Sequence, residues 1–326
     1  MKVLIRADAS VQIGMGHRVR CQALISEFIS LGWQCQFVVH RSCMAFAEPN
    51  DYLVDDEQAF LSFAMAVDLV ILDHYQYQAC DIAELFQYQP NLLVLDDMND
   101  RGAFPARWVL NPLNEEYSEC ISEPLVGPQY ALLRAEFSAC DTRKYRADKL
   151  LITLGGTDPL MLTLPILKSL QRHAFPLEKI HILLGKNAAN ADAVKAFSED
   201  NNMNLEQGLT DVTPLMAEAK MAISAAGGTL FELASMGVPT VFAQVADNQT
   251  RSLEQHVPLG WCYSVRFDDV ALEGQEKRVE SLVRQVLRVW SDSSWLQEAK
   301  EIAQSLVDSK GAVRVAQVIT KALIAR

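Results

Sequence analysis

Short runs of Val, Ile and Leu alternate along this chain with longer stretches in which apolar residues recur at helical spacing. In the first half the apolar runs predict β-strands at residues 3–6, 36–39, 69–72, 92–95 and 108–110. Stretches such as 18–30 and 81–88 lie between these runs and predict helices. The alternation is typical of βαβ units around a parallel sheet, so we predict an α/β fold.

The chain becomes polar and charged between residues 139 and 148, which indicates a linker. Further strands are predicted after it, at 150–154, 180–184, 221–224 and 238–242. We therefore predict two tandem doubly wound, Rossmann-like domains, residues 1–145 and 146–326. Ligands bind beyond the carboxyl ends of the strands in such sheets, which predicts an active site in a cleft between the domains. The last 50 residues are predicted to be helical, and one of these helices is a candidate to pack back on the first domain.

Charge and composition narrow the possible ligands. The 326 residues carry a net charge of −12, which disfavours nucleic acid and anionic membranes as partners. No apolar run reaches the roughly 20 residues of a membrane span, and the first residues do not resemble a signal peptide, so we expect a cytoplasmic protein. The seven cysteines include no C-x-x-C pair, so neither a disulfide framework nor a zinc site is expected.

The first glycine-rich turn contains a histidine. Gly14 and Gly16 allow the backbone to approach a ligand closely, and a helix is predicted to follow. A dinucleotide-binding turn would need a third glycine where Val19 stands, and an acidic residue in the region of residues 40–41, which are His and Arg. His17 is therefore a candidate general base, since histidine titrates near neutral pH. The alternative is that it only caps the helix.

Two pairs of titratable residues follow predicted strands, and each pair contains an aspartate. Asp73 and His74 come directly after the run 69–72. Neighbours on extended chain point to opposite faces, so one of the two is expected to be structural. Asp96 and Asp97 follow the next run, and loop capping is favoured over a metal site because no further ligand stands at recognisable spacing.

The second domain contains two more glycine-rich turns, and both are candidate phosphate sites. Each stands between a predicted strand and a predicted helix, where free backbone N–H groups can hold a diphosphate without metal. Pro159 is expected to help start the first of these helices. The turns consist of Gly155, Gly156 and Thr157, and of Ala226, Gly227, Gly228 and Thr229.

Polar residues next to these turns have two interpretations each. Glu232 either accepts hydrogen bonds from a ribose diol or forms a capping box with Thr229. Asn248 and Gln249 follow the run 238–242 and can satisfy sugar hydroxyl or acetamido groups. The alternative for Asn248 is a helix N-cap.

Together these motifs resemble those of the UDP-2,4-diacetamido-2,4,6-trideoxy-β-L-altropyranose hydrolases of pseudaminic acid biosynthesis. The resemblance extends over about three-quarters of the chain. The segments that carry it are 6–10, 13–21, 73–75, 95–97, 100–101, 127–134, 155–159 and 247–249.

The resemblance implies a fold like that of the GT-B glycosyltransferases, especially the enzyme that adds N-acetylglucosamine in peptidoglycan assembly. It also implies a hydrolase that needs no metal or cofactor, in a nonulosonic acid pathway linked to flagellin glycosylation. By resemblance His17 activates water for attack on C1 of the UDP-linked diacetamido sugar, with inversion and loss of UDP. The residues implied in substrate binding are Arg6, Asp8, Gly14, Gly16, Tyr75, Gly155, Gly156, Thr157, Ala226, Gly227, Gly228, Thr229, Glu232, Asn248 and Gln249.

Some segments depart from the family pattern. Residues 226–232 read Ala-Gly-Gly-Thr-Leu-Phe-Glu, closer to a generic glycosyltransferase loop than to Gly-Gly-Ser-Thr-Thr-Trp-Glu, and residues 111–114 also differ. These departures concern the sugar more than the reaction. Two alternatives stay open: a GT-B glycosyltransferase that uses a UDP-amino sugar, and a non-catalytic nucleotide-sugar binding protein. Asp8 and His74 are the next candidate bases after His17.

Overall fold

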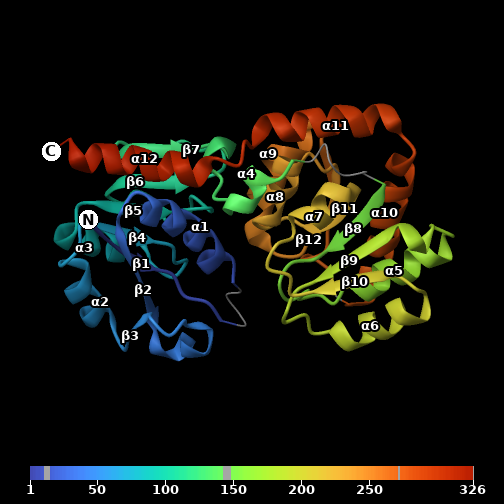
Figure 1. Ribbon diagram of the computed structural model, residues 1–326, viewed down its shortest axis with the longest axis horizontal. Coiled ribbons are helices and arrows are strands. Elements are labelled where there is room, and N and C mark those ends of the chain that lie inside the picture. The colour runs from blue at the N-terminus through green and yellow to red at the C-terminus, as the bar shows by residue number, and fades with distance from the viewer. Residues whose placement is uncertain (11–14, 142–147, 271, 326) are drawn as a thin grey trace. The chain divides into compact units, whose positions relative to one another are not determined.

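The computed structural model describes residues 1–10, 15–141, 148–270 and 272–325 (Figure 1). The chain forms two compact units. The first unit is Met1–Ala135 together with Ser309–Arg326, and the second unit is Glu136–Asp308. The boundary expected between residues 145 and 146 lies outside the described residues, as does Gly14.

The first unit is built on a seven-stranded sheet in the order β3-β2-β1-β4-β5-β6-β7. All neighbouring strands of this sheet are parallel. The strands are β1 (Lys2–Arg6), β2 (Gln34–His40), β3 (Tyr52–Val54), β4 (Leu69–Leu72), β5 (Leu92–Leu95), β6 (Ala106–Asn111) and β7 (Ile121–Val126). The five strands predicted from the sequence are present, and β3 and β7 are additional.

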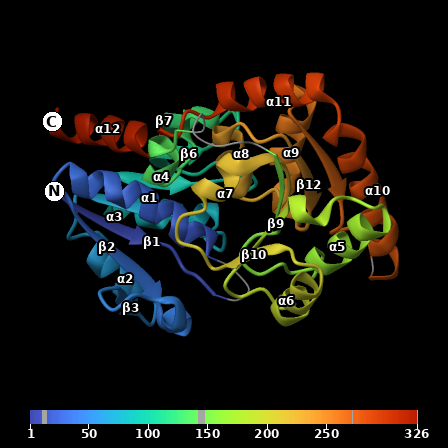
Figure 2. The same ribbon diagram turned by 45° about the vertical axis from the view of Figure 1, so that its right-hand side comes forward.

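Helices cover both faces of this sheet. On one face α1 (Gly16–Ser30) lies beside α12 (Gly311–Ile324), as both views show (Figure 2). On the other face α2 (Glu57–Ala64) and α3 (Ala79–Tyr88) pack on the sheet. Successive residues of a strand serve opposite faces: Ile5 is buried with α1 and α12, whereas Leu4 is buried with α2 and α3.

The final helix belongs to the first unit, which confirms the expectation that one of the last helices packs back on the first domain, although the predicted domain ranges placed residues 309–326 in the second. Val315, Ala316 and Ile319 of α12 are buried in one cluster with Phe28 of α1. Gly311 begins the helix where a Cβ atom would lie 2.1 Å from the carbonyl oxygen of Ala131. The close backbone approach allows α12 to bury its apolar face on the first unit. This burial outweighs the position of α12 in the sequence, directly after the second unit.

The second unit repeats the plan with six parallel strands in the order β10-β9-β8-β11-β12-β13. The strands are β8 (Lys149–Thr153), β9 (Ile180–Leu184), β10 (Asn204–Gln207), β11 (Ala219–Ala225), β12 (Thr240–Gln244) and β13 (Cys262–Arg266). The helices are α5 (Thr163–Arg172), α6 (Ala191–Asp200), α7 (Thr213–Glu218), α8 (Thr229–Met236), α9 (Thr250–His256), α10 (Leu272–Trp290) and α11 (Ser293–Leu306), while α4 (Ala135–Ala139) stands at the boundary between the units.

In both units the first strand lies at the centre, and the chain later returns to add strands on its other side. The strand order therefore reverses between β1 and β4, and again between β8 and β11. Ligands of doubly wound sheets bind at the carboxyl ends of the strands at such a reversal. Each unit thus has one preferred position for a ligand.

Candidate active site

His17 and Asp73 meet at the strand reversal of the first unit. His17 lies in the first turn of α1, after β1, and Asp73 directly follows β4, the neighbour of β1. The two residues are buried, with His17 6% exposed and Asp73 1% exposed. The Nδ1 atom of His17 lies 2.5 Å from Oδ1 of Asp73.

The charge of Asp73 determines which nitrogen of His17 carries the proton. Burial opposes this charge, but Arg20 and His17 outweigh it and hold the pKa of the carboxyl well below its usual range. A carboxylate cannot donate, so the hydrogen bond requires a proton on Nδ1 of His17. In neutral His17 the Nε2 atom therefore has the lone pair, which is the arrangement of a general base with an orienting carboxylate.

Arg20, Asp97 and Tyr75 complete this polar group. The guanidinium of Arg20 donates to both oxygens of Asp73, at 2.5 and 2.6 Å, and to both oxygens of Asp97, at 2.7 and 2.8 Å. The hydroxyl of Tyr75 donates to Asp97 at 2.7 Å, and its ring packs edge-on against the ring of His17 with 4.3 Å between centroids. From the sequence, loop capping is the favoured interpretation of Asp97, and neither Arg20 nor Asp73 is paired with His17. In the structure, Asp97 accepts from the side chains of Arg20 and Tyr75. The positions of Asp73 after β4, Asp97 after β5 and Arg20 within α1 were the available signal.

A second acid–histidine pair occupies the opposite face of the same sheet. Asp8 accepts from Arg6 at 2.5 Å and from the backbone N–H of His40 at 2.9 Å. Burial opposes the charge of Asp8, but the bonds from His74 and Arg6 lower the pKa of the carboxyl well below its usual range. The expectation that Asp73 and His74 face opposite ways is confirmed.

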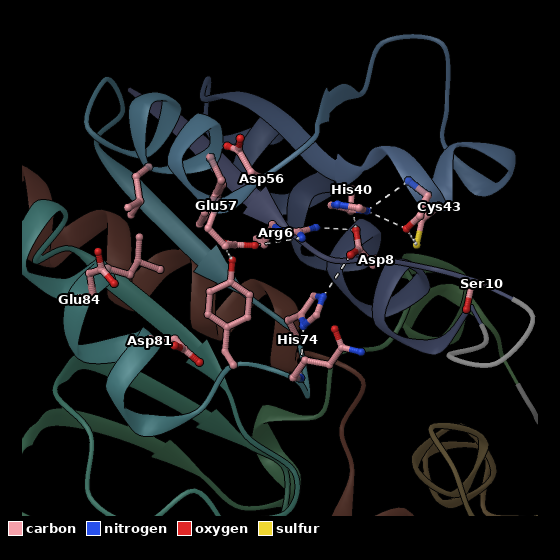
Figure 3. Close-up of a pocket in the computed structure, with 16 residues that line it drawn as sticks. Arg6, Asp8, Ser10, His40, Cys43, Asp56, Glu57, His74, Asp81 and Glu84 are labelled. Carbon is pink, nitrogen blue, oxygen red and sulfur yellow. Dashed lines mark hydrogen bonds and ion pairs between the residues drawn. The ribbon is translucent and has the colours of Figure 1, made fainter.

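His74 uses both ring nitrogens within the protein. Its Nε2 donates to Asp8 at 3.1 Å, and its Nδ1 accepts from the backbone N–H of Gln76 at 3.3 Å (Figure 3). Its carbonyl oxygen also accepts from Arg101 at 2.9 Å. While these bonds hold, His74 has no lone pair with which to take a proton from water, so it is the structural member of the Asp73–His74 pair.

Arg6, Asp8 and His74 line a cavity of about 790 Å³, hereafter the first-unit cavity. Its wall is made by the ends of β1 and β4, the segment after β2, and the helices α2 and α3 (Figure 3). His17 and Tyr75 do not line it.

Backbone rather than side chains occupies the strand reversal of the second unit. Gly155 and Gly156 follow β8, and Gly227 and Gly228 follow the neighbouring strand β11. A Cβ atom at any of these four positions would meet no atom of the described residues within 4 Å. Gly155 also has a φ of +79°, which glycine adopts without strain. Open space next to exposed backbone is what an anionic ligand needs for close approach.

The helix after the first of these turns begins later than predicted. The α5 helix starts at Thr163, and the buried carboxylate of Asp158 accepts from the backbone N–H groups of Leu162 and Thr163 at 2.9 and 3.0 Å. Asp158 therefore satisfies the start of this helix, and Pro159 does not begin it. The carbonyl oxygen of Thr157 accepts from the N–H of Ala189 at 3.3 Å.

The second turn leads directly into α8. Ala226 is buried, whereas Gly227 and Gly228 are exposed. Gly228 is the N-cap residue and Thr229 is already helical. The capping-box interpretation of Thr229 and Glu232 is therefore wrong, because the box needs Thr229 at the N-cap. Glu232 is half-buried in the first turn of α8.

The last predicted pair, Asn248 and Gln249, lies in a short 3₁₀ turn after β12 (residues Asp247–Gln249). Gln249 is 8% exposed, and its side-chain oxygen accepts from the backbone N–H of Val245 at 3.0 Å. Asn248 is exposed and is not the N-cap of α9, a position that Gln249 occupies. The helix-capping alternative for Asn248 is therefore wrong.

Gly16 is the first residue of α1 and is exposed, and a Cβ placed there would meet no atom within 4 Å in the part of the chain that the structure describes. Across the described ranges, no three His, Cys, Asp or Glu side chains are grouped so that they could hold a metal ion. None of the helices described combines the length and the apolar character of a membrane span.

Relatives of the chain carry names that match the resemblance seen in the sequence. A UDP-2,4-diacetamido-2,4,6-trideoxy-β-L-altropyranose hydrolase of Campylobacter jejuni is 27% identical over 69% of this chain and 85% of its own. A Helicobacter pylori protein named both a pseudaminic acid cytidylyltransferase and a hydrolase of that type is 25% identical over 89% of this chain, which spans 52% of that protein. The spore coat polysaccharide biosynthesis protein SpsG of Bacillus subtilis is 22% identical over 98% of both chains.

Solved structures and a family profile agree on the fold. The structure of MurG from Acinetobacter baumannii matches with a TM-score of 0.66 at 17% identity, over 98% of this chain and 99% of that one. The prediction of a GT-B-like fold with two doubly wound sheets is confirmed. The profile of the glycosyltransferase family 28 C-terminal domain matches residues 150–315, about half of the chain. The chain therefore belongs to the family defined by the glycosyltransferase family 28 C-terminal domain.

Proposed function

We propose that this protein is a UDP-sugar hydrolase that releases UDP and a free 2,4-diacetamido-2,4,6-trideoxyhexose from the corresponding UDP-sugar. The observation that carries the proposal is the 2.5 Å contact between His17 Nδ1 and the charged Asp73, which leaves Nε2 of His17 as a base. The names of the Campylobacter and Helicobacter relatives support the choice of substrate. We also propose a cytoplasmic location and a role in pseudaminic acid biosynthesis.

In the proposed reaction, Nε2 of His17 takes a proton from water as the water oxygen attacks C1 of the sugar. The bond between C1 and the β-phosphate oxygen breaks, and UDP leaves with the bonding electron pair. A single displacement inverts the configuration at C1. Asp73 stabilises the imidazolium that forms and keeps the ring in place through Nδ1. General-base catalysis of this type contributes about 10²–10⁴-fold.

We assign UDP to the glycine turns of the second unit. Backbone N–H groups at 155–157 and 226–229, with the amino end of α8, would stabilise the negative charge that grows on the leaving diphosphate. Glu232 is the acceptor for the ribose diol. Asn248 contacts the ligand through its exposed amide. Gln249 contacts it through its NH₂ group, because its side-chain oxygen already accepts from the backbone N–H of Val245. This arrangement needs no divalent ion.

Arg6, Asp8, Gly14, Gly16 and Tyr75 remain proposed substrate residues of the first unit. Tyr75 is the best placed of those described, because its exposed ring packs against His17. Gly16 offers open space at the start of α1.

A glycosyltransferase that uses a UDP-amino sugar is the second candidate, and the match to the glycosyltransferase family 28 C-terminal domain favours it. Incubation with UDP-diacetamidohexoses in ¹⁸O-labelled water, without any acceptor, separates the two functions. A hydrolase gives the free sugar with the label on its C1 oxygen, and NMR at early times shows the inverted anomer. Turnover only after an acceptor sugar is added would establish the transferase. Tight binding of the UDP-sugar without turnover in either case would indicate a binding protein.

A further inference from the structure

His17 does not line the first-unit cavity, but residues that line it are neighbours in the sequence of Asp73, the partner of His17. His74 lines the cavity and directly follows Asp73, which holds His17. Tyr75 comes next and contacts the His17 ring, and Gln76 lines the cavity again. One segment, residues 73–76, therefore serves both the proposed base and the cavity.

The charges of the cavity are largely satisfied within the protein. Asp56 and Asp81 accept backbone N–H groups at the starts of α2 and α3, each at 2.8 Å. Glu57 accepts from the hydroxyl of Tyr77 and lies 3.6 Å from Arg6. Arg6 is the only Lys or Arg among the described residues of the wall, and it also pairs with Asp8. The cavity therefore offers no uncompensated positive charge to a diphosphate. Most of its carboxylates already have hydrogen-bond or ion-pair partners within the protein.

The remaining groups suit a neutral ligand that forms hydrogen bonds. Among the described residues, the side chains of Gln76 and Glu84 are wall groups for which no hydrogen bond or ion pair occurs within the protein. Gln76 can donate to an amide carbonyl, and Glu84 can accept from an amide N–H or a hydroxyl. Phe60, Leu61 and Leu85 are the apolar side chains near these groups in the wall, and Leu61 is the most exposed of the three at 7%.

We propose that the first-unit cavity binds the sugar of the substrate by its acetamido groups, with Gln76 and Glu84 as specificity-determining residues. This inference rests on the proposed function. A diacetamidohexose is neutral, carries amide donors and acceptors together with methyl groups, and is small enough for about 790 Å³. The diphosphate stays outside the cavity, in agreement with the charges of the wall.

The test compares Glu84→Gln and Gln76→Ala with wild type in steady-state hydrolysis of a UDP-2,4-diacetamido-2,4,6-trideoxyhexose. Both side chains are exposed, so the substitutions leave the buried core unchanged. Because Glu84→Gln replaces a charged acceptor with a neutral one and Gln76→Ala removes a hydrogen-bonding side chain, we expect KM to rise about tenfold for Glu84→Gln and about threefold for Gln76→Ala. The inhibition constant of UDP alone should stay within about twofold in both variants, since UDP is assigned to the second unit. Glu119→Gln, an exposed substitution outside the cavity wall, serves as the matched control.

Three outcomes separate this inference from the proposed function. Hydrolysis with unchanged KM in both variants would overturn the cavity assignment and leave the hydrolase in place. An equal loss of UDP affinity would overturn it as well, because the effect would then not be specific to the sugar. Absence of hydrolysis by wild type overturns the proposed function, and the cavity is then judged by calorimetric titration with the free diacetamidohexose. Saturable binding that Glu84→Gln weakens about tenfold supports the cavity site, and absence of binding refutes it.

Discussion

The two units have the same strand order up to the sixth strand, but they place different kinds of residue at the point where the strand order reverses. In the first unit it holds charged side chains, with His17 and Asp73 in contact and Arg20 beside them. In the second unit it holds glycines with open space beside them. Under the proposed function, one topological position thus serves two tasks. Proton transfer needs directional, titratable side chains, whereas diphosphate binding needs bare backbone N–H groups.

The difference also has an energetic side. Buried charges cost desolvation free energy, so each carboxylate of the first unit's cluster is surrounded by donors that compensate it. The glycines of the second unit cost conformational entropy instead, because glycine loses more freedom on folding than other residues. The comparison predicts that substitutions in the first unit alter turnover and that those in the second alter UDP affinity.

The largest expected effect is on turnover in His17→Asn. Without the base, kcat for hydrolysis of the UDP-diacetamidohexose should fall about 10²–10⁴-fold. The affinity for UDP should stay within about twofold, because the residues assigned to UDP belong to the other unit. Stopped-assay measurement of released UDP gives kcat, and titration calorimetry gives the UDP affinity. Near-normal turnover of this variant would remove His17 from the mechanism, and Asp8 would then be the next base to test.

The strands of both central sheets could be predicted because buried parallel strands form continuous apolar runs. The runs 69–72 and 92–95 coincide with β4 and β5. Edge strands such as β3 and β10 were not predicted, because they are short and only partly buried. The docking of α12 on the first unit depends on contacts with residues nearly 300 positions earlier, such as Phe28. Local patterns cannot specify such a contact.

The candidate site was predictable only in outline. Strand alternation correctly separated Asp73 from His74, but it did not show which partner each would meet. The pairing of Asp73 with His17 depends on β4 lying next to β1, although β2 and β3 come between them in the sequence. The helix-capping alternatives for Glu232 and Asn248 failed because each N-cap lies one residue away from the expected position. Helix boundaries are the least certain feature of a sequence pattern.

A second comparison concerns two buried histidines, and it predicts how acid acts on the second unit. His256 of α9 is 2% exposed, and its Nδ1 accepts from the indole of Trp261 at 3.2 Å. Among the interactions described, no carboxylate contacts His256, whereas Asp73 contacts His17. Burial lowers its pKa from 6.5 to about 4. The unfolded chain therefore binds this proton more tightly than the folded protein does.

The contribution of His256 to stability is fully present above pH 6.5 and is lost as the pH falls toward 4. The free energy of unfolding should decrease by about 3 kcal/mol over this range. Denaturant unfolding at several pH values measures the effect. His256→Asn keeps an acceptor near the Nδ1 position and should flatten the pH dependence. An equally steep dependence in this variant would assign the acid sensitivity to other groups.

Glu232→Ala tests the side-chain part of the UDP site. Loss of a charged acceptor for the ribose diol should weaken UDP binding by about 1–3 kcal/mol, measured by titration calorimetry. Glu232 also stands in the first turn of α8, where an acidic residue contributes about 0.3–1 kcal/mol to the helix. A fall in stability alone, with UDP affinity unchanged, would make the residue structural. Glu254→Ala, at an exposed position of α9, is the matched control.

The smallest effect is expected for a single methyl group placed on the backbone of the second unit. Gly228 does not have a positive φ, and a Cβ atom at this position would meet none of the described atoms within 4 Å. Gly228→Ala should therefore leave folding intact, and any loss of UDP affinity reports a ligand that approaches the backbone closely. We expect a loss of about tenfold, the equivalent of about 1.4 kcal/mol. Gly16→Ala is the counterpart in the first unit, since Gly16 also has open space beside it, and should leave UDP affinity unchanged. Equal losses in the two variants would contradict the assignment of UDP to the second unit, whereas no loss in either would place the diphosphate away from this glycine turn.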